Sequence, residues 1–159
     1  MGQVERAVFK DGMAIYHLIK EYPVEVLPRS LSDITVNIDR FFVYREEKEI
    51  IGAVAFKILP EVGKEDEHII EIVSLCVKKG NHKSGIGRAL VETVVMHIQQ
   101  FHPTKIMLLT FTPKFFAKLG FKRISKRNLY NKIYLGCINC TKYTNPLTCP
   151  EVAMALKMN

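Results

Sequence analysis

The sequence predicts an α/β fold of the α+β kind, in which helices flank a mostly antiparallel sheet. Runs rich in β-branched and aromatic residues alternate with amphipathic helical patterns along the chain. Three of these runs follow one another with no helical pattern between them, which favours antiparallel pairing. The 159 residues have the length of one domain, so we expect a single domain over residues 1–159.

The N-terminal part predicts one strand and two helices. Residues 4–9 alternate polar and apolar side chains, as a short strand does. Residues 11–22 carry apolar residues at helical spacing, with Asp11 as the expected cap. A second amphipathic helix follows, capped by Ser30 or Ser32, and a loop bearing Arg29 joins the two helices.

The middle of the chain predicts three consecutive strands. Residues 41–59 give two of them, separated by the charged hairpin REEKE. The third, within residues 68–77, follows an acidic loop at residues 61–67. The remaining elements expected are a helix at 85–101, a strand at 105–111, a helix ending at Gly120, and strands at 121–125 and 151–158. The predicted order is β-α-α-β-β-β-α-β-α-β-β.

Charge and composition narrow the class of protein. The net charge of +7 and pI near 9.3 attract polyanions, including a phosphate-bearing cofactor. The sequence has no nucleic-acid recognition motif, so nucleic acid is not an expected partner. It has no apolar run near the ~20 residues that span a bilayer, and no signal peptide pattern, so we expect a cytoplasmic protein with no membrane partner.

One loop carries the strongest functional signal. The strand ending at Val77 breaks into a basic loop that opens into a helical pattern at Gly85 and Gly87. Helix N-termini leave N–H groups unpaired and carry the positive end of the helix dipole, so they bind phosphate oxygens. The basic residues around the turn are Lys78, Lys79, Lys83 and Arg88. The pattern predicts a diphosphate site, although a tight turn alone also selects glycine.

Two separated motifs, SLCVKKGNHKSGIGRALVE and TFTPKFFAKLGF, resemble the GCN5-related N-acetyltransferase (GNAT) superfamily. The resemblance implies a centrally splayed sheet and acetyl-CoA as cosubstrate. His82 stands where the family usually has Arg or Gln, and Phe116 where many members have a Tyr that protonates the leaving thiolate. The cofactor-binding residues that it implies are Leu75, Cys76, Val77, His82, Lys83, Ser84, Gly85, Ile86, Gly87, Arg88 and Phe116.

The stretches LPRSL, EIVSLCV, TFTPKFF, LYNKIY and CINC look like the short N-acetylglutamate synthases. This narrower resemblance implies transfer of acetyl to the α-amino group of an amino acid, with L-glutamate the best-matched acceptor and arginine biosynthesis the setting. It implies that Arg29 binds a substrate carboxylate, and that Lys132 or Arg127 binds the second one. Glu71 lies fourteen residues before Gly85, the spacing at which histone-acetylating members place a general base.

Several alternatives stay open. The acceptor could be another amino acid, a polyamine or a protein N-terminus, and a noncatalytic CoA-binding regulatory module is a rival from another class. Glu71 could be a solvent-facing strand residue, and Arg29 a solvated loop residue. Nothing in the sequence sets the oligomeric state, so a homodimer is open.

The cysteines give no firm site. Cys137, Cys140 and Cys149 form C-x2-C-x8-C, which offers three sulfurs where a structural zinc site normally has four ligands. We therefore assign no metal ligand, and a bound metal, a disulfide or free thiols all remain open. Cys76 lacks a neighbouring His to activate it, and is expected to be a small buried apolar residue.

Overall fold

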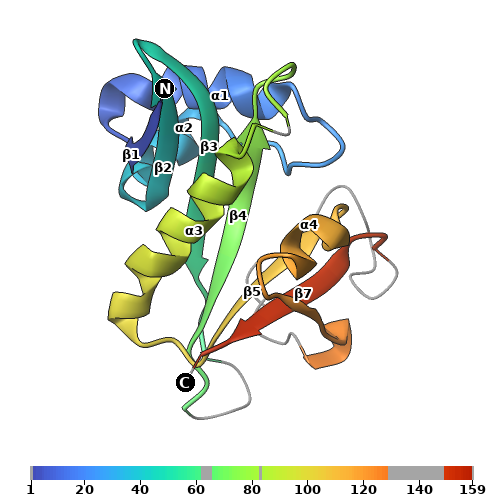
Figure 1. Ribbon diagram of the computed structural model, residues 1–159. Helices are drawn as coiled ribbons and strands as arrows, with labels where there is room; N and C mark the ends of the chain where they lie inside the picture. The colour runs from blue at the N-terminus through green and yellow to red at the C-terminus, as the bar shows by residue number, and fades with distance from the viewer. Residues whose placement is uncertain (1, 62–65, 83, 129–148, 159) are drawn as a thin grey trace. The chain divides into compact units, whose positions relative to one another are not determined.

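The computed structural model describes residues 2–61, 66–82, 84–128 and 149–158 (Figure 1). The chain divides into two compact units, Met1–Phe56 with Ile72–His97, and Lys57–Glu71 with Ile98–Asn159. Strands β3 and β4 contribute residues to both units. The elements are β1 (Gln3–Arg6), η1 (Phe9–Asp11), α1 (Gly12–Lys20), α2 (Leu31–Val36), η2 (Ile38–Arg40), β2 (Phe41–Glu46), β3 (Glu49–Ile58), β4 (Ile69–Val77), α3 (Ile86–Ile98), η3 (Gln99–Phe101), β5 (Lys105–Thr110), α4 (Pro113–Ala117), β6 (Lys122–Arg123), η4 (Lys126–Asn128) and β7 (Val152–Lys157).

The sheet has seven strands in the order β1-β2-β3-β4-β5-β7-β6. The pairs β1–β2, β2–β3, β5–β7 and β6–β7 are antiparallel, and β4–β5 is parallel. The parallel register joins Ile69–Glu71 to Lys105–Met107 and stops there, although both strands continue. The predicted α/β class, the mostly antiparallel sheet and the order of helices and strands are confirmed.

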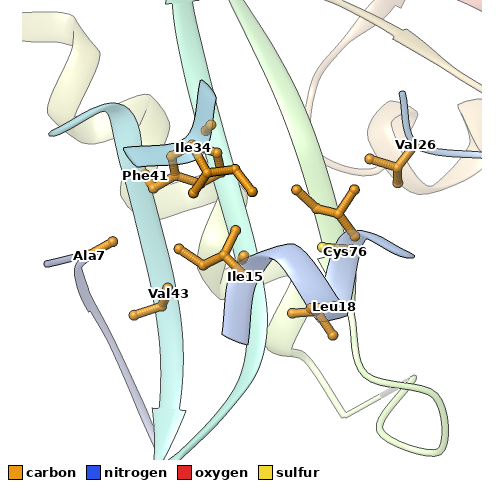
Figure 2. Close-up of a cluster of buried hydrophobic side chains, with 11 residues drawn as sticks. Ala7, Ile15, Leu18, Val26, Ile34, Phe41, Val43 and Cys76 are labelled. Atoms are coloured by element: carbon orange, nitrogen blue, oxygen red, sulfur yellow. The ribbon is translucent and has the colours of Figure 1, made fainter. Parts of the chain in front are cut away.

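In the first unit the strands have helices on both faces, because side chains alternate along a strand. Helices α1 and α2 cover one face and close an apolar core (Figure 2). In Figure 2, Ile15 and Leu18 project from α1 toward the strands, near Cys76 on β4. The buried members of this core are Ala7, Ile15, Leu18, Ile19, Val26, Ile34, Phe41, Val43, Ala53, Ala55 and Cys76.

Helix α3 covers the opposite face of the same strands (Figure 1). There Phe42 and Phe56 contact the His97 ring, with ring centroids 5.1 and 5.6 Å apart. Burial, followed by the charge of Arg6, lowers the pKa of His97, so this residue packs as a neutral ring. At the N-terminal end of α3, the side chains of Ile86 and Leu90 pack directly against the backbone of β3, because β3 has glycine at position 52.

Substitution of Gly52 is expected to destabilise the first unit. A Cβ atom there would lie 2.9 Å from both Ile86 Cγ2 and Leu90 Cδ1 at the start of α3. Gly52→Ala should therefore lower the free energy of unfolding by about 1–3 kcal/mol, the usual cost of overpacking. Denaturant unfolding measures it. Gly12→Ala is the matched control, because its Cβ would meet Leu31 Cδ1 at an ordinary 3.7 Å. An equal loss in both variants would contradict the packing argument.

Several element ends differ from the sequence prediction. The first strand ends at Arg6, and Phe9–Asp11 forms a 3-10 turn. Asp11 does not cap α1 with its side chain; its carboxylate accepts hydrogen bonds from Val8 N and Arg45 Nη2, each 2.9 Å away. The α3 helix ends at Ile98 and continues as a 3-10 turn. Of the two serines proposed as caps for α2, Ser30 is the cap, and its Oγ accepts from the N–H of Asp33 at 3.0 Å.

The second unit contains β5, β6, β7, α4 and η4, together with the N-terminal end of β4. Its core joins Leu59, Ile69, Met107 and Ala153. Within the described ranges, no helix is both long enough and apolar enough to cross a membrane.

Candidate active site

The C-terminal half of β4 has an irregular backbone at Ser74. Its φ of +56° lies in the left-handed region, which costs a residue with a side chain about 1–3 kcal/mol inside a strand. A left-handed residue within a strand turns the following peptide groups away from the regular strand direction. Leu75, Cys76 and Val77 follow it, and these are the residues that sequence analysis assigned to the cofactor.

Arg29 contacts this irregular segment. Its guanidinium donates from Nη1 to Ser74 Oγ at 3.2 Å and from Nε to Asp33 Oδ2 at 2.6 Å. It also lies over the Phe41 ring, 4.8 Å from the centroid, and only 12% of the side chain is exposed. Arg29 is thus held in one place on β4 and is not a solvated loop residue.

The local sequence explains how Arg29 is held. Ser30 caps α2, so Arg29 precedes the cap and Asp33 lies in the first helical turn, four residues on. Asn37 Nδ2 donates to Asp33 Oδ1 at 2.9 Å and fixes the carboxylate in turn. Asp33 and Ser74 hold Arg29 in place, and the sequence reasoning did not identify either of them. The Arg29–Asp33 spacing was a usable signal, whereas Ser74 is too distant in sequence to give one.

The end of β4 is held by Tyr22 and His82. The Tyr22 hydroxyl donates to the Val77 carbonyl and lies 2.6 Å from His82 Nε2, which is itself 3.0 Å from that carbonyl. Burial, followed by the charge of Glu21, raises the pKa of Tyr22, so its hydroxyl keeps its proton at neutral pH. His82 is thereby tied to β4. Tyr22 carries no local motif and was also missed by sequence analysis.

The glycine-containing loop has the backbone expected of an anion site. Gly85 has a φ of +84°, and a Cβ built on it would meet nothing within 4 Å. Its carbonyl accepts the first helical hydrogen bond, from Ala89 N at 3.0 Å. The N–H groups before Ala89 therefore have no acceptor within the helix and are directed out of its N-terminal end. Ser84, Gly85 and Arg88 are exposed.

Two of the basic residues near this loop have acidic partners. Arg88 Nε lies 2.7 Å from Glu92 Oε1, with both side chains more than half exposed, and Lys78 donates to Glu49. Such exposed pairs are weak and can exchange for a phosphate group. Lys83 lies outside the described residues.

Glu71 and Phe116 belong to the second unit. Glu71 is only 2% exposed and stands opposite Met107 in the parallel β4–β5 register, so it is not a solvent-facing strand residue. Phe116 is 5% exposed and packs edge to face against Phe115 and Phe121, with centroids 4.9 and 5.7 Å away. Of the two residues predicted to bind the second carboxylate, Arg127 is exposed on η4, and Lys132 lies outside the described residues.

Two of the four cysteines, Cys76 and Cys149, belong to the described residues. Burial, followed by the charge of Glu21, raises the pKa of Cys76 to about 12, so its thiol is neutral and a poor nucleophile at neutral pH. Cys149 Sγ lies 3.9 Å from Glu151 Oε2. Cys137 and Cys140 lie outside the described residues. Within the part of the chain that the structure describes, no group of three or more His, Cys, Asp or Glu is arranged to hold a metal ion.

Comparisons with known proteins identify the family of this chain. The family model described as an acetyltransferase (GNAT) domain matches residues 37–123. The chain is 32% identical over 155 residues to an uncharacterized N-acetyltransferase of Chlorobaculum tepidum, covering 95% of this chain and 93% of that protein.

Solved structures share the fold at low identity. The Mycobacterium tuberculosis protein Rv2747, in complex with CoA and NLQ, superposes with a TM-score of 0.76 at 22% identity, over 98% of this chain and 99% of that one. The N-acetylglutamate synthase of Neisseria gonorrhoeae, complexed with CoA and N-acetyl-glutamate, superposes with a TM-score of 0.80 at 19% identity. All of this chain is covered there, but only 35% of the synthase.

The seven-stranded sheet flanked by helices is the fold of these solved structures. The chain belongs to the GNAT acetyltransferase family. It is an N-acetyltransferase whose cosubstrate is acetyl-CoA.

Proposed function

We propose that this enzyme transfers the acetyl group of acetyl-CoA to the α-amino group of an amino acid, and that L-glutamate is the best-matched acceptor. The observation that carries the proposal is Arg29, a nearly buried guanidinium fixed against the irregular segment of β4. The fold similarity to a synthase crystallised with N-acetyl-glutamate also supports glutamate as the proposed acceptor.

Arg29 has the chemistry to bind a carboxylate. A guanidinium offers five N–H donors, and two of them are used within the described part of the chain, one by Asp33 and one by Ser74. Both partners hold the group in a fixed orientation, which reduces the entropy lost when a substrate binds. A planar fork held in this way suits bidentate binding of a carboxylate.

The second carboxylate of glutamate needs another cation. Lys132, outside the described residues, and Arg127, on η4, are the two proposed partners. A single-domain enzyme over residues 1–159 that carries all of these groups remains our proposal.

Acetyl transfer makes three further demands on the chain. The acceptor nitrogen must lose a proton as it bonds to the acyl carbon, and we assign that proton to Glu71, directly or through water. The N–H groups that follow Ser74, at Leu75–Val77, are proposed to stabilise the developing oxyanion as the C–S bond breaks. The N-terminus of α3 at Gly85–Arg88 is proposed to bind the diphosphate of acetyl-CoA, which leaves as the thiol after taking up a proton.

One observation favours a second acceptor class. The carboxylate of Asp33 already neutralises much of the Arg29 charge, and this suits an acceptor that carries one carboxylate or none. CoA release measured across glutamate, other amino acids and polyamines discriminates the two. Turnover with polyamines far above that with glutamate would exclude glutamate as the main acceptor.

Arg29→Ala is expected to lower kcat/KM for glutamate by about ten- to a hundredfold, because a charge-assisted hydrogen bond contributes about 1.5–3 kcal/mol. The affinity for acetyl-CoA should stay unchanged, as calorimetric titration can measure. Arg6→Ala, which removes an exposed positive charge from the same unit, is the control and should retain full activity. Normal turnover of glutamate by Arg29→Ala would remove the carboxylate anchor and with it the main reason to prefer glutamate.

A further inference from the structure

One carboxylate of the first unit has an oxygen with nothing to bind. Glu21 Oε2 is buried, and among the described residues it is the one buried side-chain nitrogen or oxygen that lacks a hydrogen-bond partner. A buried carboxylate oxygen with no donor destabilises the protein that contains it. Such an atom therefore points to a ligand that supplies the missing donor.

Glu21 is the C-cap residue of α1 and precedes Tyr22, which bonds to the end of β4. Its backbone N–H bonds to the carbonyls of Leu18 and Ile19, whose side chains pack in the same apolar core as Cys76. The next residue, Tyr22, donates its hydroxyl to Val77 at the end of β4.

The charge of Glu21 affects the pKa of a residue on β4. After burial, it is the second cause that raises the pKa of the Cys76 thiol. Ser74, which Arg29 contacts, and Cys76, on which this charge acts, are two residues apart on the strand.

Three described lysines, one next to Glu21 in sequence and two just after β4, contact other groups. Lys78 donates to Glu49, and Lys79 lies over the Tyr22 ring, 5.7 Å from its centroid. Lys20 lies over the Tyr16 ring, 5.0 Å from its centroid. Within the described ranges, each of these three lysines contacts a group other than Glu21 Oε2. The donor that Glu21 lacks is an N–H group from outside these residues.

We infer that Glu21 binds the nitrogen of the acceptor, with Oε2 accepting a hydrogen bond from its amino group. This inference rests on the proposed transfer to an amine. It adds an anionic partner to the cationic one: Arg29 receives the carboxylate of an amino acid and Glu21 its amino group. An N–H remains to donate after the acceptor nitrogen has lost its extra proton, so Glu21 contributes to binding and Glu71 to proton removal.

The test separates binding from turnover. Glu21→Gln keeps the shape of the side chain and removes its charge, and initial rates are measured against acceptor concentration at saturating acetyl-CoA. We expect the acceptor KM to rise at least about tenfold, with kcat within about threefold of wild type. Glu25→Gln is the matched control, because it removes an exposed acidic charge four residues along the chain, and it should keep the wild-type KM.

A readout other than turnover checks the same point. If Oε2 lacks a partner in the free protein, Glu21→Gln should melt at the same temperature as wild type or higher. The acceptor alone should raise the melting temperature of wild type, and this rise should be lost in Glu21→Gln. If Glu21→Gln fails to fold, Glu21→Asp retains the charge with a shorter reach and should also raise KM.

The outcomes distinguish this inference from the proposed acceptor. An unchanged acceptor KM in Glu21→Gln, or a lower melting temperature with unchanged kinetics, overturns the role of Glu21. If wild type acetylates a polyamine and not glutamate, the proposed acceptor fails, and the Glu21 variants are measured with the polyamine. A raised KM there still supports the Glu21 contact, because that contact is made to the amino group.

Discussion

Glu71→Gln is expected to lower kcat at neutral pH by about a hundredfold or more, the range in which a positioned general base contributes. The loss should fall on kcat and leave the affinity for acetyl-CoA near that of wild type. It should shrink as the pH is raised, because more of the acceptor amine is then already deprotonated. Initial rates from neutral to alkaline pH measure both the loss and its relief.

The control for Glu71→Gln is Glu67→Gln. Glu67 is also mostly buried and forms an ion pair with Lys105 at 2.7 Å, so its substitution removes a charge from the same unit without touching the proposed base. It should leave kcat and its pH profile unchanged. A Glu71→Gln enzyme that is folded and fully active at neutral pH would show that another group takes the proton. Equal losses in both variants would indicate a structural effect.

Gly85→Glu is expected to weaken acetyl-CoA binding at least tenfold. The substitution adds bulk and negative charge where a diphosphate must approach the first N–H groups of α3. It also forces a side chain into a left-handed backbone, with φ at +84°, at a cost of about 1–2 kcal/mol in stability. Calorimetric titration measures the first effect and a melting curve the second.

Gly80→Glu separates the two effects. Gly80 has a similar φ of +92°, and a Cβ there would also meet nothing within 4 Å, so the backbone strain is matched. Gly80 lies in the turn before the loop and not at the start of the helix. Equal stability losses with a binding loss in Gly85→Glu alone are expected. Unchanged acetyl-CoA affinity in a folded Gly85→Glu would remove this loop from the cofactor site.

The elements of the fold were predictable because their signals are local. Alternation predicted the strands, helical spacing predicted α1, α2 and α3, and Ser30 was one of two serines that could cap α2. Errors occurred where a distant residue decided the outcome. Asp11 is at the position and of the residue type expected for a helix cap, but its carboxylate forms an ion pair with the guanidinium of Arg45 instead.

The site was predictable only in part, for the same reason. The glycine loop is continuous in sequence, and its left-handed Gly85 follows from the turn before α3. The contact of Arg29 with Ser74 and the bond of Tyr22 to Val77 join α1 and α2 to a strand far along the chain. No spacing rule relates such residues. The unpartnered oxygen of Glu21 is a property of packing, which a sequence does not express.

The neutral Cys76 thiol bears on how the first unit opens. Because burial raises the pKa of this thiol to about 12, Cys76 stays almost entirely protonated at pH 8 while the core is closed. Reagents that need a thiolate therefore reach Cys76 only during brief openings, in which its ionisation becomes ordinary. The rate at which Cys76 is modified therefore reports how often the core around α1 and β4 opens. Any ligand that favours the closed form lowers that rate.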